Sequence, residues 1–265
     1  MKKIVQRVML NSKCSKIFVF VLLAIFSFPQ SLISAGSNVD LIEQNWPFHG
    51  VFGRFDKASL QRGFKVYREV CAGCHGIRHI AYRDLEDIGF TKDEIKSIAS
   101  EYELLDGPND EGEMFTRYAK LSDKFVSPYE NVNAARVANN GAYPPDLSLI
   151  TKARSGGADY LYSLLNGYKE YPENFEASEG MYYNEYYPGN QIAMPAPIED
   201  DIVEYDDGTE ASQSQIARDV TSFLAWTAEP ELETRKSLGV KTIFFLILIS
   251  IMLLGVKRKI WKDLD

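Results

Sequence analysis

CAGCH, at residues 71–75, is the stretch that determines the fold class of this chain. Two cysteines separated by two residues and followed directly by a histidine form the attachment motif of a c-type haem. Cys71 and Cys74 would form thioethers with the porphyrin vinyl groups, and the imidazole of His75 would become the proximal ligand of the iron. A bare C-x-x-C pair also suits zinc or thiol redox chemistry, but the chain has only three cysteines in all. We therefore predict one covalently bound haem c.

The residues before this motif predict a helix that ends at the first cysteine. From Asp56 to Cys71 the apolar side chains recur every three or four residues, which is typical of one face of a helix. Further helices are expected over residues 91–102, 158–166 and 212–227, the first of them opened by a capping box at its start. Residues 103–157 otherwise predict loops and short helices, and residues 180–197, rich in Tyr, Pro and Gly, predict a long loop. The expected fold is mainly α with little sheet.

The first 35 residues are expected to be a signal peptide. Positively charged residues precede an apolar run from Ile17 to Phe28, and the small residues that follow allow cleavage near Ala35. Cys14 would be removed with this segment. The alternative is an uncleaved membrane anchor, which would ordinarily need an apolar run of ~20 residues. Cleavage would leave residues 36–237 as an exported haem domain.

The sequence from Leu238 to Val256 is expected to form one C-terminal transmembrane helix. Its 19 residues contain a single charge, Lys241, and as a helix they would measure about 28 Å against a hydrocarbon core of ~30 Å. A basic cluster from Lys257 to Lys259 follows directly. The positive-inside rule then places the tail, residues 257–265, in the cytoplasm and the haem domain on the other side of the membrane.

The exported domain is strongly acidic. The full chain has a net charge of −8, and residues 36–240 carry 35 acidic against 19 basic side chains. A surplus of this size argues against nucleic acid as a partner and favours a basic protein. One candidate acidic surface comprises Glu199, Asp200, Asp201, Glu204, Asp206, Asp207 and Glu210. A loop that is merely solvated is the alternative interpretation of the same residues.

The sixth position on the iron decides whether the haem carries electrons or binds small molecules. Met194 is the preferred ligand, because prolines stiffen the backbone on its C-terminal side and 119 residues separate it from His75. That separation is long enough for the chain to cross to the distal face of the haem. Met181 and His49 are the alternatives, whereas His79 lies too close in sequence to His75 to reach the opposite face.

Arg136 is a candidate partner of a haem propionate. A guanidinium can pair with a carboxylate through two parallel hydrogen bonds, and Arg136 lies in the stretch AARVANNGAYPPDLS at residues 134–148. A surface arginine without a ligand is the alternative interpretation.

These residues together resemble the cytochrome c1 family, the haem subunits of the quinol:cytochrome c oxidoreductase of mitochondria and alphaproteobacteria. The resemblance covers essentially the mature chain. It is carried by CAGCH at 71–75, the stretches 136–148 and 181–197, and the single C-terminal anchor, which occur in the order typical of the family. Some bacterial relatives have an additional cysteine pair, and this chain has no cysteines left to form one.

The resemblance implies a role for each candidate residue. Cys71 and Cys74 would bind the haem covalently, His75 and Met194 would be its axial ligands, and Arg136 would contact a propionate. The fold would be a cytochrome c-like haem domain with long loop insertions and one anchor.

The resemblance also implies partners and a location. The protein would take one electron from a Rieske iron-sulfur protein and pass it to a soluble or anchored c-type cytochrome, with cytochrome b as its membrane neighbour. It would be an electron-transfer subunit of an enzyme complex in the bacterial inner membrane, with its haem domain on the periplasmic side. Whether the isolated chain is an enzyme is left open.

Two other functions are compatible with a haem motif. A free-standing, membrane-anchored cytochrome c would shuttle electrons without belonging to a complex, and the long stretch between the motif and Met194 argues against so compact a design. A haem peroxidase or reductase would need a vacant sixth position on the iron.

Overall fold

The computed structural model describes residues 39–262 except 174 and 177. The expected signal peptide, with Cys14, lies outside the described residues, as do the last three residues of the expected cytoplasmic tail. The described residues belong to a single compact unit, Asn38–Asp265.

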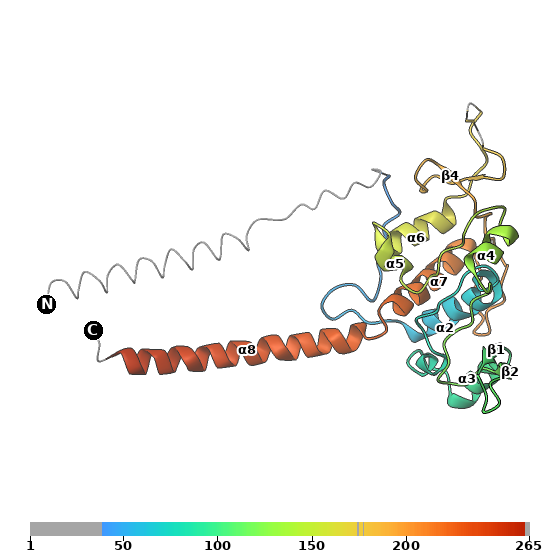
Figure 1. Cartoon of the computed structure of the whole chain (residues 1–265). Coiled ribbons are helices and arrows are strands. Elements are labelled where there is room, and N and C mark those ends of the chain that lie inside the picture. Colours follow the sequence, from blue (N-terminus) through green and yellow to red (C-terminus); the bar gives the residue numbers. More distant parts are fainter. Residues whose placement is uncertain (1–38, 174, 177, 263–265) are drawn as a thin grey trace, which may run out of the picture. The chain divides into compact units, whose positions relative to one another are not determined.

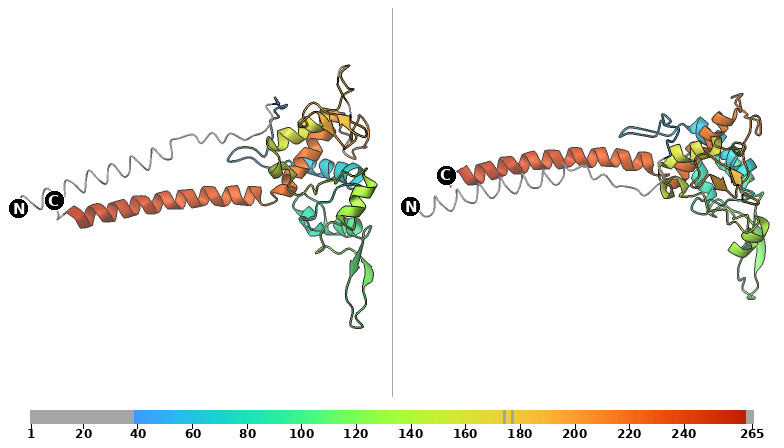
Figure 2. Two further views of the ribbon diagram at one scale, coloured as in Figure 1. Left: turned by 45° about the horizontal axis from the view of Figure 1, so that its top comes forward. Right: turned by 90° about the horizontal axis from the view of Figure 1, so that it is seen from above.

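The described chain is mainly helical, as predicted, with two short hairpins (Figures 1 and 2). The helices are α2 (Lys57–Val66), α3 (Lys92–Ala99), α4 (Val132–Ala138), α5 (Ile150–Ala153), α6 (Gly157–Asn166), α7 (Gln213–Ala228) and α8 (Leu232–Trp261), with a π-helical turn at Tyr67–Cys71 and a 3₁₀ turn at Tyr82–Glu86. The strands are β1 (Glu103–Asp106), β2 (Phe115–Tyr118), β3 (Tyr182–Tyr183) and β4 (Gln191–Ile192).

Four of the described helices, α2, α3, α4 and α7, begin directly after a short polar side chain that caps them. Asp56 accepts a hydrogen bond from the N–H of Ala58, the second residue of α2, and Ser212 accepts one from the N–H of Gln215, the third residue of α7. The capping box predicted at the start of α3 is confirmed, because Thr91 accepts from the backbone N–H of Glu94 while the Glu94 carboxylate accepts from the N–H of Thr91. The helix ends at Ala99, a turn earlier than expected.

The core is built on α7, which lies between α2 and α6 (Figure 1). Where α2 crosses α7, a Cβ at Gly63 would lie 2.1 Å from the carbonyl oxygen of Asp219 and 2.7 Å from the Cβ of Phe223. Only glycine allows this close approach. Beside it, the rings of Phe64 and Phe223 lie 5.6 Å apart in a large cluster of buried side chains.

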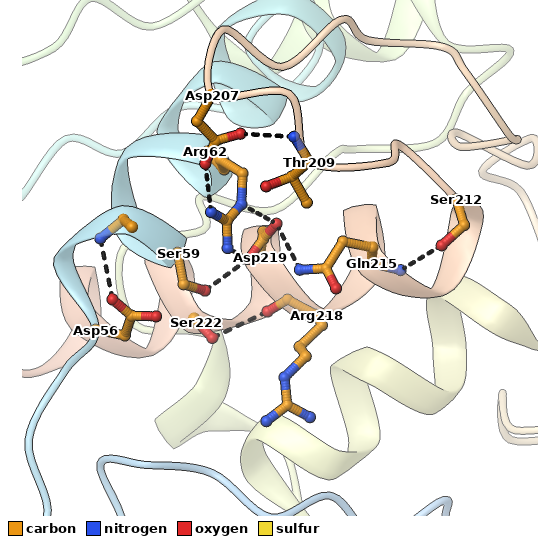
Figure 3. Close-up of polar contacts among 11 residues, drawn as sticks. Asp56, Ser59, Arg62, Asp207, Thr209, Ser212, Gln215, Arg218, Asp219 and Ser222 are labelled. Carbon is orange, nitrogen blue, oxygen red and sulfur yellow. Dashed lines mark hydrogen bonds and ion pairs between the residues drawn. The ribbon is translucent and has the colours of Figure 1, made fainter.

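A buried polar network also joins the two helices (Figure 3). The carboxylate of Asp219, on α7, is fully buried and accepts hydrogen bonds from Ser59 Oγ at 2.6 Å, Arg62 Nε at 2.8 Å and Gln215 Nε2 at 2.9 Å. Arg62 donates further to Asp207 at 2.7 Å. The network therefore ties α2, α7 and the acidic loop before α7 together.

The antiparallel pair β1–β2 differs from the loops and short helices expected over residues 103–157. Leu105 pairs with Thr116 and Glu103 with Tyr118, and these four side chains share one face of the hairpin. Leu105 and Tyr118 are both exposed. Because neither face of this hairpin is well buried, its strands lack the alternation of apolar and polar residues that signals a strand in the sequence.

The predicted membrane span lies within α8. This helix begins at Leu232, after a break at Glu229–Pro230, and continues without interruption to Trp261. Its apolar side chains from Leu238 to Val256 are exposed, and among the described residues it is the one helix long and apolar enough to cross a membrane.

Candidate functional site

The CAGCH motif follows directly on the helix that delivers it. The π-helical turn Tyr67–Cys71 continues α2, and the N–H of Ala72 bonds the carbonyl of Tyr67 at 2.7 Å. The N–H groups of Cys74 and His75 then both bond the carbonyl of Cys71, at 3.1 and 2.9 Å. The motif is therefore a tight turn closed on its first cysteine. Turns of the π type are frequent at functional sites.

Both cysteines of the motif are free thiols. Cys71 is half-buried and packs against the main core, whereas Cys74 is exposed. Burial raises the pKa of the Cys71 thiol to about 12. A redox-active C-x-x-C pair needs a lowered thiol pKa, because the thiolate is the reactive species. The environment of Cys71 therefore disfavours thiol redox chemistry, and no cluster of three or more potential metal-binding His, Cys, Asp or Glu side chains occurs among the described residues.

The ring of His75 is held by one hydrogen bond. Its Nδ1 lies 2.7 Å from the carbonyl oxygen of Pro145. A carbonyl can only accept, so Nδ1 carries the proton, and Nε2 is left with a free lone pair. Desolvation lowers the pKa of His75, which favours the neutral ring that a metal requires. The backbone of His75 is held as well, because the hydroxyl of Tyr67 donates to its carbonyl at 3.1 Å.

Pro145 belongs to a segment that bonds to His75 and to the residues that directly follow the motif. The N–H of Leu147 bonds the carbonyl of Gly76 at 2.8 Å, and the carboxylate of Asp146 accepts from the N–H of Arg78 at 3.0 Å. Asp146 also accepts from the N–H of Ser148 at 3.0 Å. The sequence indicated that residues 134–148 are functional but did not reveal these hydrogen bonds between residues 145–148 and residues 75–79. A signal did exist, because two consecutive prolines before Asp146 hold the backbone extended.

Met194 lies just after β4, half-buried against the same core cluster as Cys71. The hydroxyl of Tyr168 donates to its carbonyl at 3.2 Å. The peptide between Met194 and the proline that follows it is thus held by this bond and by the proline ring. Met181 lies half-buried before β3, and its carbonyl accepts from the hydroxyl of Tyr171 at 2.5 Å.

The two other histidines are both exposed. The ring of His49 stands edge-on to Phe48, at a centroid distance of 5.1 Å. The backbone N–H of His79 donates to Ser148 Oγ at 3.1 Å, which adds to the hydrogen bonds between residues 145–148 and the residues after the motif.

Arg136 lies on α4 and is exposed. Its Nη1 donates to the carbonyl of Gly141 at 2.8 Å, which closes the turn after the helix. Among the described residues it makes no hydrogen bond with His75, Met194 or the cysteines. Its role toward a propionate stays a prediction.

Part of the acidic loop is neutralised within the chain. Asp207 pairs with Arg62 at 2.7 Å and Asp206 with Lys65 at 3.0 Å, both on α2. Asp200 accepts from a backbone N–H at the start of α7. The remaining acidic side chains of the loop are exposed and make no ion pair with any described residue: Glu199, Asp201, Glu204 and Glu210.

Comparison with known proteins identifies close relatives. The sequence model of the Cytochrome C1 family matches residues 46–264. A protein of Arabidopsis thaliana named cytochrome c1 1, heme protein, mitochondrial, is 49% identical over 239 residues, which cover 90% of this chain and 78% of the relative. Cytochrome c1 of Rhodospirillum rubrum is 47% identical over 241 residues, covering 85% and 89%. A Candida albicans protein named cytochrome b-c1 complex catalytic subunit, mitochondrial, is 51% identical over 221 residues, covering 83% and 77%.

Proposed function

This chain belongs to the cytochrome c1 family, and from that premise we propose that it transfers single electrons through one covalently bound haem c, ligated by His75 and Met194. The donor is a Rieske iron-sulfur protein and the acceptor a c-type cytochrome. One relative is named as a subunit of the cytochrome b-c1 complex and another is named cytochrome b/c1, which supports cytochrome b as the membrane neighbour.

The observation that carries the proposal is the geometry of His75. The Nδ1–H of His75 donates to the carbonyl of Pro145, so the ring presents an unprotonated Nε2 in a fixed orientation. The thiols of Cys71 and Cys74 stand on the same tight turn. Two free thiols and an oriented neutral imidazole fit a c-type haem, which supplies a reversible one-electron couple when bound.

The chain's own residues would then set the properties of the haem. Met194 would fill the sixth position, and a thioether there raises the reduction potential relative to a second imidazole. A filled position also excludes water and small ligands from the iron. Arg136 would pair with a propionate from the end of α4.

The decisive experiment compares Met194→Ala with Met181→Ala in the purified full chain. We expect Met194→Ala to lose the methionine-to-iron absorption band of the oxidised protein and to lower the reduction potential, while Met181→Ala retains both. Unchanged spectra and potential in Met194→Ala would contradict the assigned ligand. Rapid binding of carbon monoxide by the reduced, unsubstituted protein would indicate an open iron site and hence a haem enzyme.

The propionate contact has its own test. Arg136→Gln should shift the midpoint potential of the haem and weaken retention of the haem by the protein, because a propionate charge would lose its partner. Arg83→Gln is a matched control, since Arg83 is an exposed arginine on another segment. Equal potentials in the two variants would show that Arg136 is a surface residue only.

The partners can be tested separately from the haem ligands. Co-purification with cytochrome b and a Rieske protein would distinguish a complex subunit from a free-standing anchored cytochrome. Electron transfer to a basic c-type cytochrome should slow as salt rises, because the exposed acids at residues 199–210 would attract it. A rate independent of salt would rule out this docking surface.

The haem domain is proposed to lie on the periplasmic side, with the C-terminus in the cytoplasm.

A further inference from the structure

The segment Trp46–Phe55, called here the 46–55 loop, has a buried base and an exposed apolar tip. Trp46 and Phe48 are buried in a small cluster of their own, and the indole of Trp46 donates to Asp159 at 2.7 Å. At the tip, Val51 is 62% and Phe52 is 83% exposed. An adjacent pair of large apolar side chains held out in this way suggests a contact that the isolated domain does not make.

The tip is presented by an ordered turn. The N–H of Arg54 bonds the carbonyl of Pro47 at 2.9 Å, which closes the loop at its neck. Gly50 has a φ of +74°, and a Cβ at Gly53 would lie 1.9 Å from the carbonyl oxygen of His49. Two glycines are therefore required for this conformation. A turn held this tightly presents its tip without a large loss of conformational entropy on binding.

The loop is fastened to the first turns of α8. Lys236 Nζ donates to the carbonyls of Phe48, at 2.7 Å, and Gly53, at 3.4 Å. The N–H of Phe55 donates to the carboxylate of Glu233 at 2.9 Å. In Figures 1 and 2 the loop, drawn in blue, lies beside the start of α8 and extends along it.

This attachment sets the height of the loop relative to the membrane. The apolar run of α8 begins at Leu238, about 3 Å along the helix axis from Lys236 and about 8 Å from Glu233. The headgroup layer on each side of the hydrocarbon core is about 5–8 Å thick. The base of the loop therefore lies at the level of the headgroups, and a tip that extends along α8 reaches toward the hydrocarbon.

The 46–55 loop is basic, whereas the rest of the exported domain is acidic, so the loop is better suited to contact a lipid surface. Residues 46–55 contain His49 and Arg54 and no acidic residue, although the exported domain as a whole is strongly acidic. Arg54 is exposed at the neck of the loop. Anionic headgroups attract basic side chains that are exposed near the membrane surface.

We propose that the 46–55 loop is a second membrane contact of this chain, in which Val51 and Phe52 enter the interfacial region of the bilayer beside α8 and Arg54 faces anionic lipid headgroups. The inference rests on the proposed membrane anchoring by α8. A single helix leaves the domain free to rotate and tilt, whereas a second contact fixed to that helix restrains both motions.

The test uses the haem-loaded full chain, without other subunits, in nanodiscs of phosphatidylcholine and phosphatidylglycerol. Cys14 is replaced by Ser, the motif thiols are occupied by haem, and a nitroxide is attached to the cysteine of Phe52→Cys. Its accessibility is measured to oxygen, which partitions into lipid, and to a nickel chelate, which stays in water. Val137→Cys, at an 86% exposed site on α4, serves as the aqueous control, and Leu246→Cys on α8 serves as the lipid control.

We expect the ratio of oxygen to nickel accessibility at residue 52 to be several-fold higher than at residue 137 and to approach that at residue 246. A ratio equal to that at residue 137 would overturn the inference. Low access to both reagents would mean that protein covers the tip, which also overturns it. A water-like signal at residue 246 would instead remove the membrane anchoring itself, so the two failures are distinguishable.

A second variant keeps the tip but removes the charge. Arg54→Gln should lower the accessibility ratio at residue 52 in nanodiscs that contain phosphatidylglycerol and leave it unchanged in pure phosphatidylcholine. An equal effect in both lipids would show that Arg54 does not contact anionic headgroups. Unchanged circular dichroism and haem absorption in each labelled variant confirm that the fold is retained.

Discussion

Replacing Asp219 by Asn tests whether the buried network between α2 and α7 holds the domain together. Every group that faces this carboxylate is a donor: Ser59 Oγ and Arg62 Nη2 bond Oδ1, while Arg62 Nε and Gln215 Nε2 bond Oδ2. Asparagine has almost the same shape but only one acceptor oxygen. Whichever way the amide is turned, its NH₂ group faces a nitrogen of Arg62, which can only donate, and the Arg62 guanidinium loses its buried counter-charge.

The size of the effect follows from these contacts. The bond from an Arg62 nitrogen, worth about 1.5–3 kcal/mol, is lost, and the other bonds weaken because their acceptor is no longer charged. Breaking one side of a buried ion pair costs about 3–5 kcal/mol in all. We therefore expect Asp219→Asn to lower the free energy of unfolding by about 3–5 kcal/mol, a large share of the ~5–15 kcal/mol typical of a native protein.

The control is Asp206→Asn, which removes the charge of an 88% exposed carboxylate that pairs with Lys65 on the same helix, α2. An exposed pair contributes about 0–1 kcal/mol. Urea unfolding of the full chain in detergent, followed by far-ultraviolet circular dichroism, measures both variants. A loss below about 1 kcal/mol for Asp219→Asn, or one equal to that of Asp206→Asn, would refute the assigned role of the network.

Three further outcomes are expected. Gly63→Ala should destabilise the domain in the same unfolding assay, although alanine normally stabilises a helix by about 0.5–1 kcal/mol, because its Cβ would lie 2.1 Å from a carbonyl oxygen of α7. Thr91→Ala should cost about 1 kcal/mol through the lost cap of α3. Hydrogen bonds from the N–H of Thr209 and from Arg62 lower the pKa of Asp207 to about 2. The stability that Asp207 contributes is therefore present above about pH 4 and lost toward pH 2, so Asp207→Asn should differ from the unsubstituted protein at neutral pH and the difference should shrink below about pH 4.

The features that the sequence predicted correctly are local ones. The capping box at Thr91 lies within four consecutive residues. In α2 the apolar side chains recur every three or four residues, and in α8 they follow one another almost without interruption. Each pattern arises from residues that interact with their near neighbours in the chain, so it can be recognised without knowledge of the fold. The family resemblance also rests on local stretches, and comparison with known relatives confirms it.

The β1–β2 hairpin shows where local patterns stop being informative. Leu105 and Tyr118 are apolar but exposed, so nothing in the burial of the strands produces an alternating sequence. The acidic run before α7 is a similar case. Its composition indicated a charged surface, but it did not reveal that Arg62 and Lys65 would neutralise Asp207 and Asp206 from α2.

By itself the sequence determined the family resemblance, the longer helices and the long apolar stretch of α8, because sequence motifs and helical periodicity are local. Only the tertiary structure decided how His75 is oriented, since the carbonyl of Pro145 that holds its ring lies 70 residues away in the chain. Only the fold likewise brought Phe48 to Lys236, 188 residues apart. Both contacts use backbone carbonyls, which every residue possesses. A backbone carbonyl that accepts such a bond cannot be recognised from the residue types. Which carbonyl accepts is decided only when packing brings two distant segments together.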